Sequence, residues 1–390
     1  MVTEAKYNQV ANSICAVVVL LMAIGAVFVF SASADIGQEL DLQKFYDYPG
    51  LRQILFFPLA CLILFTVAAF DYRRLRVRRG WMKSPILYLL ILSIALLILV
   101  LIPGFGTRIN YARRWFRFAV GPFKVSFQPS ELAKWASVFF LAAFCEKYGP
   151  GIRSFWKRFV PACCIVGVVV GLIIIEDLGT AAFVAVLAFL MLIIAGAKWW
   201  HVLAPLPFGV LGFVGVLVRS PARMRRIAAF LNPEKWSDSV AYQADQSLIA
   251  IGSGGLLGKG LGGGICKYGH LPEDTTDFIF AIIGEELGFL GNAVVIGLFI
   301  IFLWLGILVV VRCKDRFGQL LAGGIVLAIG IQAALNIGVV TVVLPTKGIP
   351  LPFVSAGGTS MLLSSAAVGV LLNIACQSAR NPTELESQDE

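Results

Sequence analysis

Long runs of apolar residues, separated by short polar links, dominate the chain. An α-helix needs about 20 apolar residues to cross the ~30 Å hydrocarbon core of a bilayer. Hydrophobic residues make up 58% of the chain and charged residues only 14%, a balance that excludes an ordinary water-soluble domain. Each long run therefore predicts one membrane span, and the predicted spans are 12–32, 52–70, 85–103, 130–147, 159–175, 179–199, 202–219, 277–311, 319–344 and 353–376.

These runs predict an all-α integral membrane protein of about ten transmembrane helices, with a single polytopic domain over residues 1–376. The acidic tail 377–390 is predicted to be disordered in the cytoplasm. The first run starts too late and is too long for a cleaved signal peptide, so we interpret it as a retained span. The run 277–311 would form a helix about 50 Å long, whose first turns should project beyond the hydrocarbon.

The basic residues of the short links predict the orientation of the chain. Arginine and lysine cluster after the second, fourth and eighth predicted spans, and the positive-inside rule assigns that side, with both termini, to the cytoplasm. The formal net charge of +9 is therefore a topology signal and does not predict nucleic-acid binding. Two outer segments, 104–129 and 220–276, are also basic. One interpretation is that these charges have no role. The other, which we favour, is that they form a cationic surface for an anionic ligand such as a phosphorylated lipid headgroup.

The large outer loop 220–276 combines amphipathic stretches with a cluster of glycines between Gly252 and Gly264. Such a backbone can expose N–H groups that hold anions, or it can act as a simple hinge. The loop ends at Asp277, directly before a predicted span. The spacing favours Asp277 as a helix N-cap. The alternative is a carboxylate at the mouth of a membrane cavity that accepts a proton from a substrate hydroxyl.

Further ionisable residues lie within or beside predicted spans, where charge is costly and indicates a cavity or a partner. Glu131 and Lys134 are three residues apart and so lie on one helix face. They form either a structural ion pair or part of a site. Glu285 and Glu286 lie two turns into the predicted eighth span, and one of them is expected to be partly interfacial because this span projects outward. Lys347 lies in a link stiffened by prolines, which is either an ordinary turn or a rigid edge that places this lysine at the outer cavity.

Five ordered segments together resemble the SEDS family (shape, elongation, division and sporulation). They are ARRWFRFAVGPFKVSFQPSELAK, EDLGTA, YQADQSLIAIGSGGLLGKGLG, LPEDTTDFIFAIIGEELGF and LPTKGIPLPFVSAGGTS. The resemblance runs from about Arg113 to Ser360, which is most of the chain. The strings IIGEELG and PTKG are more similar to the FtsW division branch, or its sporulation relatives, than to the RodA elongation branch.

The resemblance implies a peptidoglycan glycosyltransferase that polymerises lipid II into β-1,4 glycan strands on the outer face of the bacterial cytoplasmic membrane. It implies as partners the nascent glycan strand, a class B penicillin-binding protein that crosslinks the glycan, and other division or elongation proteins. Asp277 matches the family's essential aspartate, which reverses the preference for the cap. The substrate-binding residues expected in the matching segments are Arg114, Trp115, Gln128, Glu131, Lys134, Asp177, Gln243, Gln246, Ser247, Ser253, Lys347 and Ser355.

The implied chemistry is attack of the 4-hydroxyl of one lipid II on the anomeric carbon of the growing glycan, with inversion and departure of a pyrophosphate. Asp277 is the expected base. Outer cations such as Arg114, Lys134 and Lys347, or a divalent ion (Mg²⁺ or Mn²⁺), would neutralise the leaving group. The sequence otherwise indicates no cofactor. The eight cysteines are scattered, and only Cys266 falls in an outer loop, so neither a disulfide framework nor a metal knuckle is expected.

The sequence departs from the family pattern PEAHTDF at Thr275, where a histidine is common. This departure puts in doubt any mechanism that needs an imidazole beside Asp277. Two other functions fit many spans and a basic outer surface. One is a flippase, or transporter, for a lipid-linked cell-wall precursor, and the other is a scaffold for the transpeptidase that has lost its catalytic role.

Overall fold

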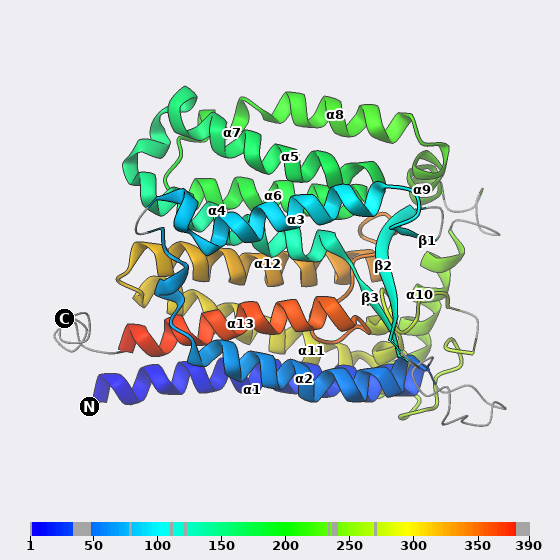
Figure 1. Cartoon of the computed structure of the whole chain (residues 1–390). Helices are drawn as coiled ribbons and strands as arrows, with labels where there is room; N and C mark the ends of the chain where they lie inside the picture. The colour runs from blue at the N-terminus through cyan, green and yellow to red at the C-terminus, as the bar shows by residue number, and fades with distance from the viewer. Residues whose placement is uncertain are drawn as a thin grey trace.

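The computed structural model describes residues 2–33, 48–77, 80–109, 112–120, 123–232, 235, 241–268 and 271–379. Within them the chain forms a layered bundle of long helices that lie roughly side by side (Figure 1). The helices are α1 (Val2–Ala32), α2 (Pro49–Ala69), α3 (Pro85–Leu101), α4 (Pro129–Tyr148), α5 (Val160–Glu176), α6 (Leu178–Ile194), α7 (Trp199–Leu203), α8 (Leu206–Val218), α9 (Pro221–Leu231), α10 (Tyr242–Gly254), α11 (Ile279–Arg312), α12 (Arg316–Val340) and α13 (Gly358–Ala379). Short 3-10 or π-helical turns cover Tyr72–Leu75, Trp81–Lys83, Gly149–Arg153 and Phe155–Phe159.

Each predicted span has a helical counterpart in this bundle. In the described part of the chain, seven helical segments are long and apolar enough to cross a membrane, and the shorter apolar helices α3 and α6 lie among them. The remaining counterpart, α4, is a continuous helix that carries buried charge at Glu131 and Lys134 near its start. The helical membrane class is therefore confirmed, whereas the number of ten crossings stays a prediction. Helix α13 continues to Ala379, three residues into the predicted tail, and residues 380–390 lie outside the described part.

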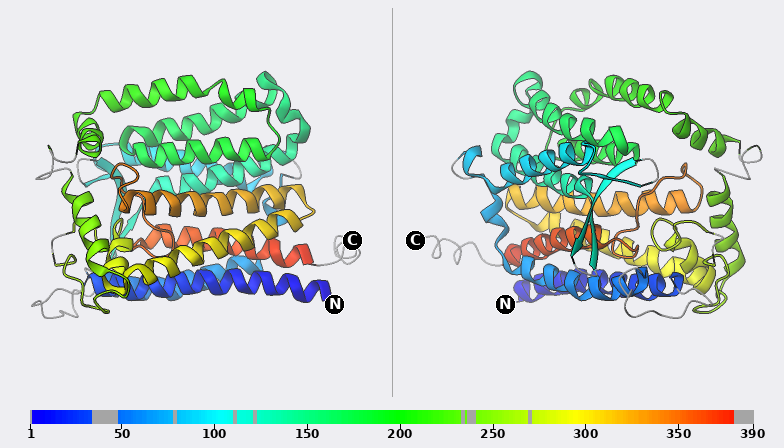
Figure 2. Two further views of the ribbon diagram at one scale, coloured as in Figure 1. Left: turned by 180° about the vertical axis from the view of Figure 1, so that it is seen from behind. Right: turned by 45° about the vertical axis from the view of Figure 1, so that its right-hand side comes forward.

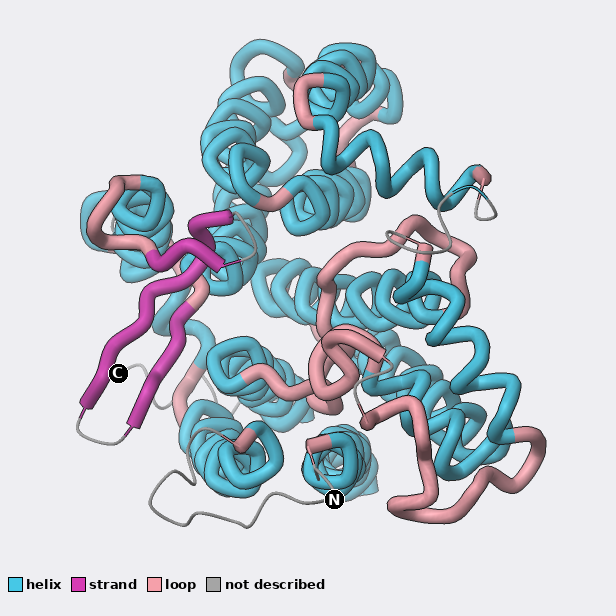
Figure 3. The backbone as a smooth tube through the Cα atoms, turned by 90° about the vertical axis from the view of Figure 1, so that its right-hand side faces the viewer, coloured by secondary structure: helices cyan, strands magenta, loops and turns pink. Residues whose placement is uncertain are grey.

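A small antiparallel sheet occupies the basic segment 104–129, for which the sequence predicted a cationic outer surface but no strands. Strands β1 (Thr107–Ile109), β2 (Ala112–Val120) and β3 (Phe123–Phe127) pair in the order β1-β2-β3. Aromatic residues favour strands, and the rings of Phe116 and Phe118 stack with their centroids 6.1 Å apart on one face of β2. The long β2–β3 hairpin crosses the end of the bundle (Figure 3).

The start of α11 differs in two ways from the predicted single helix over 277–311. Asp277 precedes the N-cap residue, Phe278, so Asp277 does not occupy the cap position that the spacing alone favoured. The helix is also interrupted at Gly288, whose φ of 67° is non-helical. A side chain at Gly288 would overlap the backbone of Leu256 and Gly258, so the glycine lets the outer loop pack against α11.

The two ends of the bundle have different contents. Both termini lie at one end in Figure 1, whereas the β-sheet, α9 and α10 gather at the other, which we call the outer end. Figure 2 shows the same separation from two further directions. Helices α7 and α8 lie along the outside of the bundle, and no residue of α8 is buried. The outer end is therefore where loops, strands and helix termini converge to build a site.

Candidate functional site

The outer end encloses a cavity of about 700 Å³. It is lined from α2, from the β2–β3 hairpin, from the end of the outer loop before α11, and from the segment between α12 and α13. The charged residues that line it are Arg52, Arg114, Arg117, Asp177, Arg226, Glu273, Asp277 and Lys347. Five cations thus face three carboxylates across one water-accessible volume, a composition that suits an anionic ligand.

Asp277 lies in the wall of this cavity. Its carboxylate accepts no hydrogen bond from the residues that the structure describes, although its backbone carbonyl accepts one from Asn336 Nδ2 at 2.7 Å. Burial, together with the negative charges of Glu273 and Asp177, raises the pKa of Asp277 to about 7, while Arg114 and Arg226 oppose this rise. A carboxyl with a pKa near neutrality is half ionised and can accept a proton at physiological pH.

The backbone around Asp277 is held by the segment that precedes α13. Ala356 N–H donates to the carbonyl of Thr275 at 2.9 Å, and Ser355 Oγ donates to the carbonyl of Thr276 at 2.5 Å. Ser355 is buried, so the structure places it as a support behind the cavity wall. The backbone at Gly348 can lie close to the Asp277 carboxylate because glycine has no side chain. A Cβ at this position would lie 2.8 Å from Asp277 Oδ2.

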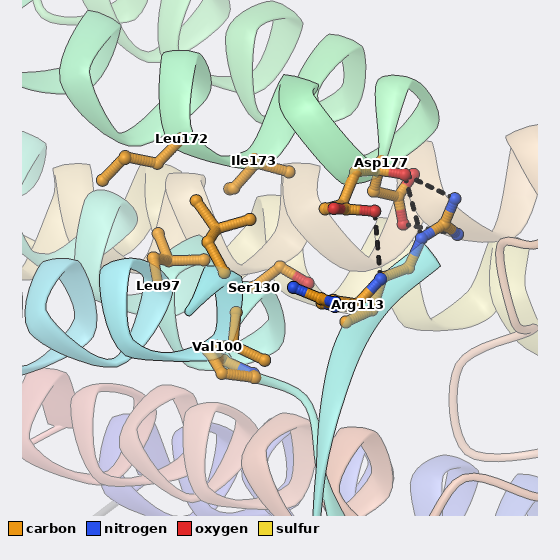
Figure 4. Close-up of a pocket in the computed structure, with 11 residues that line it drawn as sticks. Leu97, Val100, Arg113, Ser130, Leu172, Ile173 and Asp177 are labelled. Atoms are coloured by element: carbon orange, nitrogen blue, oxygen red, sulfur yellow. Dashed lines mark hydrogen bonds and ion pairs between the residues drawn. The ribbon is translucent and has the colours of Figure 1, made fainter. Parts of the chain in front are cut away.

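A second group of side chains joins β2 to the junction between α5 and α6. The guanidinium of Arg114 donates to the backbone carbonyl of Glu176 at 3.0 and 2.6 Å and pairs with Asp177 Oδ2 at 3.2 Å. Asp177 also caps α6 by accepting from Thr180 N–H at 3.1 Å. Figure 4 shows the contacts of the arginines with Asp177 and its neighbour, beside a small crevice whose walls include Leu97, Val100 and Ile173. The fork of Arg114 is therefore held in place before any ligand binds.

Lys347 faces the same cavity from the proline-rich link. Its Nζ lies 5.6 Å from the ring centroid of Phe213, and its stem passes the space left by Gly179. Burial lowers the pKa of Lys347, against an opposing effect of Asp177. The fold thus places Arg114, Lys347 and Asp277 in the same cavity, although they come from distant segments of the sequence.

Glu131 and Lys134 do not line the cavity. Lys134, 1% exposed, donates to Glu131 Oε2 at 2.7 Å and to Gln332 Oε1 at 2.9 Å. Glu131 is joined to the cavity wall through Ser360, whose Oγ donates to the same carboxylate oxygen at 2.9 Å. The charges of Glu131 and Lys134 therefore neutralise each other, and the pair holds the start of α13 from behind the cavity wall.

Of the four substrate-binding residues predicted in the outer loop, one lines the cavity and three do not. Gln243 lines the cavity, as do Trp115 and Gln128 from the hairpin and the start of α4. Gln246, Ser247 and Ser253 do not line it, and the Ser247 hydroxyl donates to the carbonyl of Val340 at 2.7 Å while that of Ser253 donates to Ala250.

The glycine-rich part of the outer loop binds two carboxylates of the protein itself. Glu285 accepts from Lys259 Nζ at 2.7 Å and from the N–H groups of Ile265 and Cys266. Glu286 pairs with Lys267 Nζ at 2.8 Å and accepts from Ser31 Oγ. Both glutamates are 0% exposed, so their charges are enclosed within the protein and held by residues of the outer loop.

Several cavity residues were not singled out from the sequence. Arg52, Gln53 and Phe56 come from the first turns of α2, and Glu273 and Ser126 come from the outer loop and β3. A polar pair at the start of an apolar run is the signal that could have identified Arg52 and Gln53. Among the residues that the structure describes, no group of three or more His, Cys, Asp or Glu is arranged to hold a metal ion.

Comparisons with known proteins give one consistent result. The family of cell cycle proteins that comprises FtsW, RodA and SpoVE matches residues 11–380. The stage V sporulation protein E of Bacillus subtilis is 41% identical over 363 residues, covering 92% of this chain and 94% of that protein. A protein of Trichlorobacter lovleyi named as a probable peptidoglycan glycosyltransferase FtsW is 38% identical over 373 residues, covering 95% and 93%.

Two solved structures share this fold over nearly the whole chain. One belongs to a peptidoglycan synthase complex described as coordinating polymerization and crosslinking, with a TM-score of 0.71, 29% identity, and coverage of 93% of this chain and 98% of that chain. The other is a crystal structure of the rod shape determining protein RodA of Thermus thermophilus, with a TM-score of 0.65, 26% identity, and coverage of 94% and 97%.

Proposed function

The chain belongs to the FtsW/RodA/SpoVE family of cell cycle proteins, and on that basis we propose that it is a peptidoglycan glycosyltransferase used in cell division. It is a multi-pass bacterial membrane protein. The proposed reaction polymerises lipid II into β-1,4 glycan strands at the outer cavity. The basic links at the end that carries both termini support a cytoplasmic position for that end, with the cavity on the outer face of the cytoplasmic membrane.

In the proposed reaction, Asp277 accepts the proton of the 4-hydroxyl of one lipid II as that oxygen attacks the anomeric carbon of the growing glycan. The bond from the anomeric carbon to the diphosphate breaks, its electron pair leaves with the diphosphate, and the configuration inverts. One base is sufficient because the diphosphate is a weakly basic leaving group. The observation that carries this proposal is the Asp277 carboxylate, which faces the cavity with a pKa of about 7 and accepts no hydrogen bond from the described residues.

Arg114 and Lys347 are the proposed partners of the departing diphosphate. Both line the cavity, and the charge of Arg114 acts on Asp277 directly. Arg114 is held by Asp177 and by the carbonyl of Glu176, so its fork is already oriented when charge develops on the leaving group. Removal of one such oriented donor typically lowers a rate by roughly 10²–10³-fold.

A class B penicillin-binding protein that crosslinks the new glycan is the proposed partner. The likeness to a structure described as a peptidoglycan synthase complex supports it. Relatives named as probable FtsW glycosyltransferases support a role in division. The similarity to a stage V sporulation protein makes sporulation the alternative role.

The decisive test is reconstitution of the purified protein in liposomes with labelled lipid II, with and without its transpeptidase. We expect glycan chains from the wild type and none from Asp277→Asn or Asp277→Ala. Asp274→Asn is the matched control, because Asp274 lies in the same loop but does not line the cavity. Full polymerisation by a folded Asp277→Asn protein would refute the proposal, and movement of headgroups across the bilayer without glycan would indicate a flippase.

A further inference from the structure

The backbone of the proposed base is held at three consecutive positions. The carbonyls of Thr275, Thr276 and Asp277 each accept a hydrogen bond from a part of the chain that follows α11. The donors to the first two carbonyls belong to the link before α13. The donor to Asp277 is different, because it is Nδ2 of Asn336 in α12, at 2.7 Å. Asn336 therefore connects the base directly to a long helix of the bundle.

The same amide group also holds the segment that carries Lys347. Asn336 Nδ2 donates to the carbonyl of Ile349 at 2.8 Å. The N–H of Ile349 in turn donates to the carbonyl of Lys347 at 3.1 Å, which closes a tight turn between these two residues. A side-chain amide has two N–H hydrogens, so it can make both bonds at once. Asn336 thus bridges the backbone of Asp277 to the turn that begins at Lys347.

The other polar atom of the Asn336 side chain is unpaired. Asn336 is 1% exposed, and its Oδ1 has no hydrogen-bond partner within the described ranges. Turning the amide over would bring this oxygen against two carbonyls, which cannot donate, so the acceptors fix the orientation of the amide. Buried polar atoms are nearly always paired. The unpaired oxygen therefore indicates that bridging the two carbonyls matters more here than satisfying the whole amide.

Gln332 lies one turn before Asn336 on the same face of α12 and is fully bonded. Its Nε2 donates to the carbonyl of Pro350 at 2.9 Å, and its Oε1 accepts from Lys134 Nζ at 2.9 Å. Both amides therefore hold the proline-rich link. In the described part of the chain, only Asn336 of these two also bonds to Asp277.

Asn336 lies behind the cavity wall. Asp277, Lys347 and Gly348 line the cavity, but Asn336 does not, so it can act only through the groups that it holds. Helix α12 packs inside the bundle against α4, α6, α11 and α13 (Figure 1). A donor fixed in this helix therefore gives the two walls of the cavity one common reference point.

We propose that Asn336 is the positioning residue that fixes Asp277 and Lys347 relative to each other. This inference rests on the proposed function. In an inverting displacement, the attacking oxygen and the departing diphosphate lie on opposite faces of the anomeric carbon. The base and the cation that receives the diphosphate must therefore be held at one separation. A misplacement of about 1 Å can lower a rate by roughly 10²-fold.

The test measures polymerisation of labelled lipid II by the full-length protein in liposomes. Asn336→Leu keeps a similar size but removes both donors, and Asn336→Asp keeps the shape but places an oxygen against the two carbonyls. Both variants should lower kcat by roughly 10²-fold and change KM by less than about threefold, because the reacting groups are misplaced while the substrate still binds. Hydrogen exchange of segments 272–278 and 346–351 should become faster in both variants.

A double-mutant cycle separates positioning from a general loss of stability. In a Lys347→Met background, Asn336→Leu should lower kcat by a smaller factor than in the wild type, because one of the groups that it positions is already absent. Asn373→Leu is the matched control. It removes a buried asparagine that donates to the carbonyl of Ala68 at 2.8 Å, at the opposite end of the bundle. It should lower Tm without lowering kcat or changing exchange in the two segments.

The outcomes separate this inference from the proposed function. If the wild type forms glycan and the folded Asn336 variants keep its kcat, or if the two factors in the cycle are equal, the positioning role is refuted while the proposed function stands. If Asn336→Leu does not fold, Asn336→Ser replaces it. Asn336→Ser keeps one donor and should show an intermediate loss, and a wild-type kcat would again refute the role. If the wild type forms no glycan with or without the transpeptidase, the proposed function fails, and the catalytic role of Asn336 fails with it.

Discussion

Two groups of carboxylates lie close together at the start of α11, and their environments are opposite. Glu285 and Glu286 are fully buried, and each is neutralised by a lysine of the outer loop. Asp277 lies only two residues before the helix, but its carboxylate faces the cavity and accepts no hydrogen bond from the described residues. Removing one partner of a buried ion pair is strongly destabilising, whereas an unpaired carboxylate with a raised pKa is available for proton transfer. The difference predicts that one acid group supports structure and the other supports reaction.

The largest expected effect comes from the same acid-to-amide change at both places. Glu286→Gln leaves Lys267, whose side chain is 1% exposed, without its anion, which typically costs about 3–5 kcal/mol. Asp277→Asn removes a carboxyl that is destabilised by its surroundings, so it should not lower stability. Thermal unfolding in detergent should show a large fall in Tm for Glu286→Gln only, and a comparable fall for Asp277→Asn would contradict the comparison.

The next prediction concerns the space that Asp277 occupies. In Gly348→Ala, the new Cβ would lie 2.8 Å from Asp277 Oδ2, so the carboxylate must move. A displacement of this kind can lower a rate by roughly 10²-fold. Polymerisation of lipid II should fall strongly while Tm changes little. Gly212→Ala on α8 is the control, because a Cβ there meets no atom within 4 Å, and equal activity of the two variants would contradict the proposed position of Asp277.

The sequence predicted the chemistry of this region better than its geometry. The apolar runs located the helices because membrane spans need length and hydrophobicity, which are local properties. The pairing of Lys267 with Glu286 could not be predicted, since nothing local indicates that a loop folds back onto the following helix. For the same reason Glu131 and Lys134 were expected at the cavity surface, although they lie beneath it. The β2–β3 hairpin was missed because basic residues hid its aromatic strand pattern.

The pH dependence of activity should also distinguish the two groups. The base at Asp277 works when ionised, so the rate should rise with pH through about 7. Glu273→Gln removes a negative charge that raises the pKa of Asp277. The rising part of the pH–rate curve should therefore shift to lower pH by less than about one unit. An unchanged curve, measured as kcat/KM against pH, would show that Glu273 does not act on the catalytic group.

The same raised pKa has a consequence for stability with a defined sign. The folded protein binds a proton at Asp277 up to about pH 7, whereas the unfolded chain releases it near the ordinary aspartate pKa of 3.8. The stability gained from the protonated form is therefore present below about pH 4 and is lost as the pH rises to 7. Over this window the Tm of the wild type should fall relative to that of Asp277→Asn, and parallel curves would contradict the assignment.

The smallest expected effect separates the two lysines of the outer loop. The side chain of Lys259 is 29% exposed, against 1% for Lys267, so water can partly replace its contact with Glu285. Glu285 also keeps the N–H groups of Ile265 and Cys266 when Lys259 is removed. Lys259→Met should therefore cost only about 1 kcal/mol, and Lys267→Met several times as much, because it strands the buried Glu286. Equal losses of Tm in the two variants would mean that the backbone N–H groups do not stabilise Glu285, and the loop would then depend on its lysines alone.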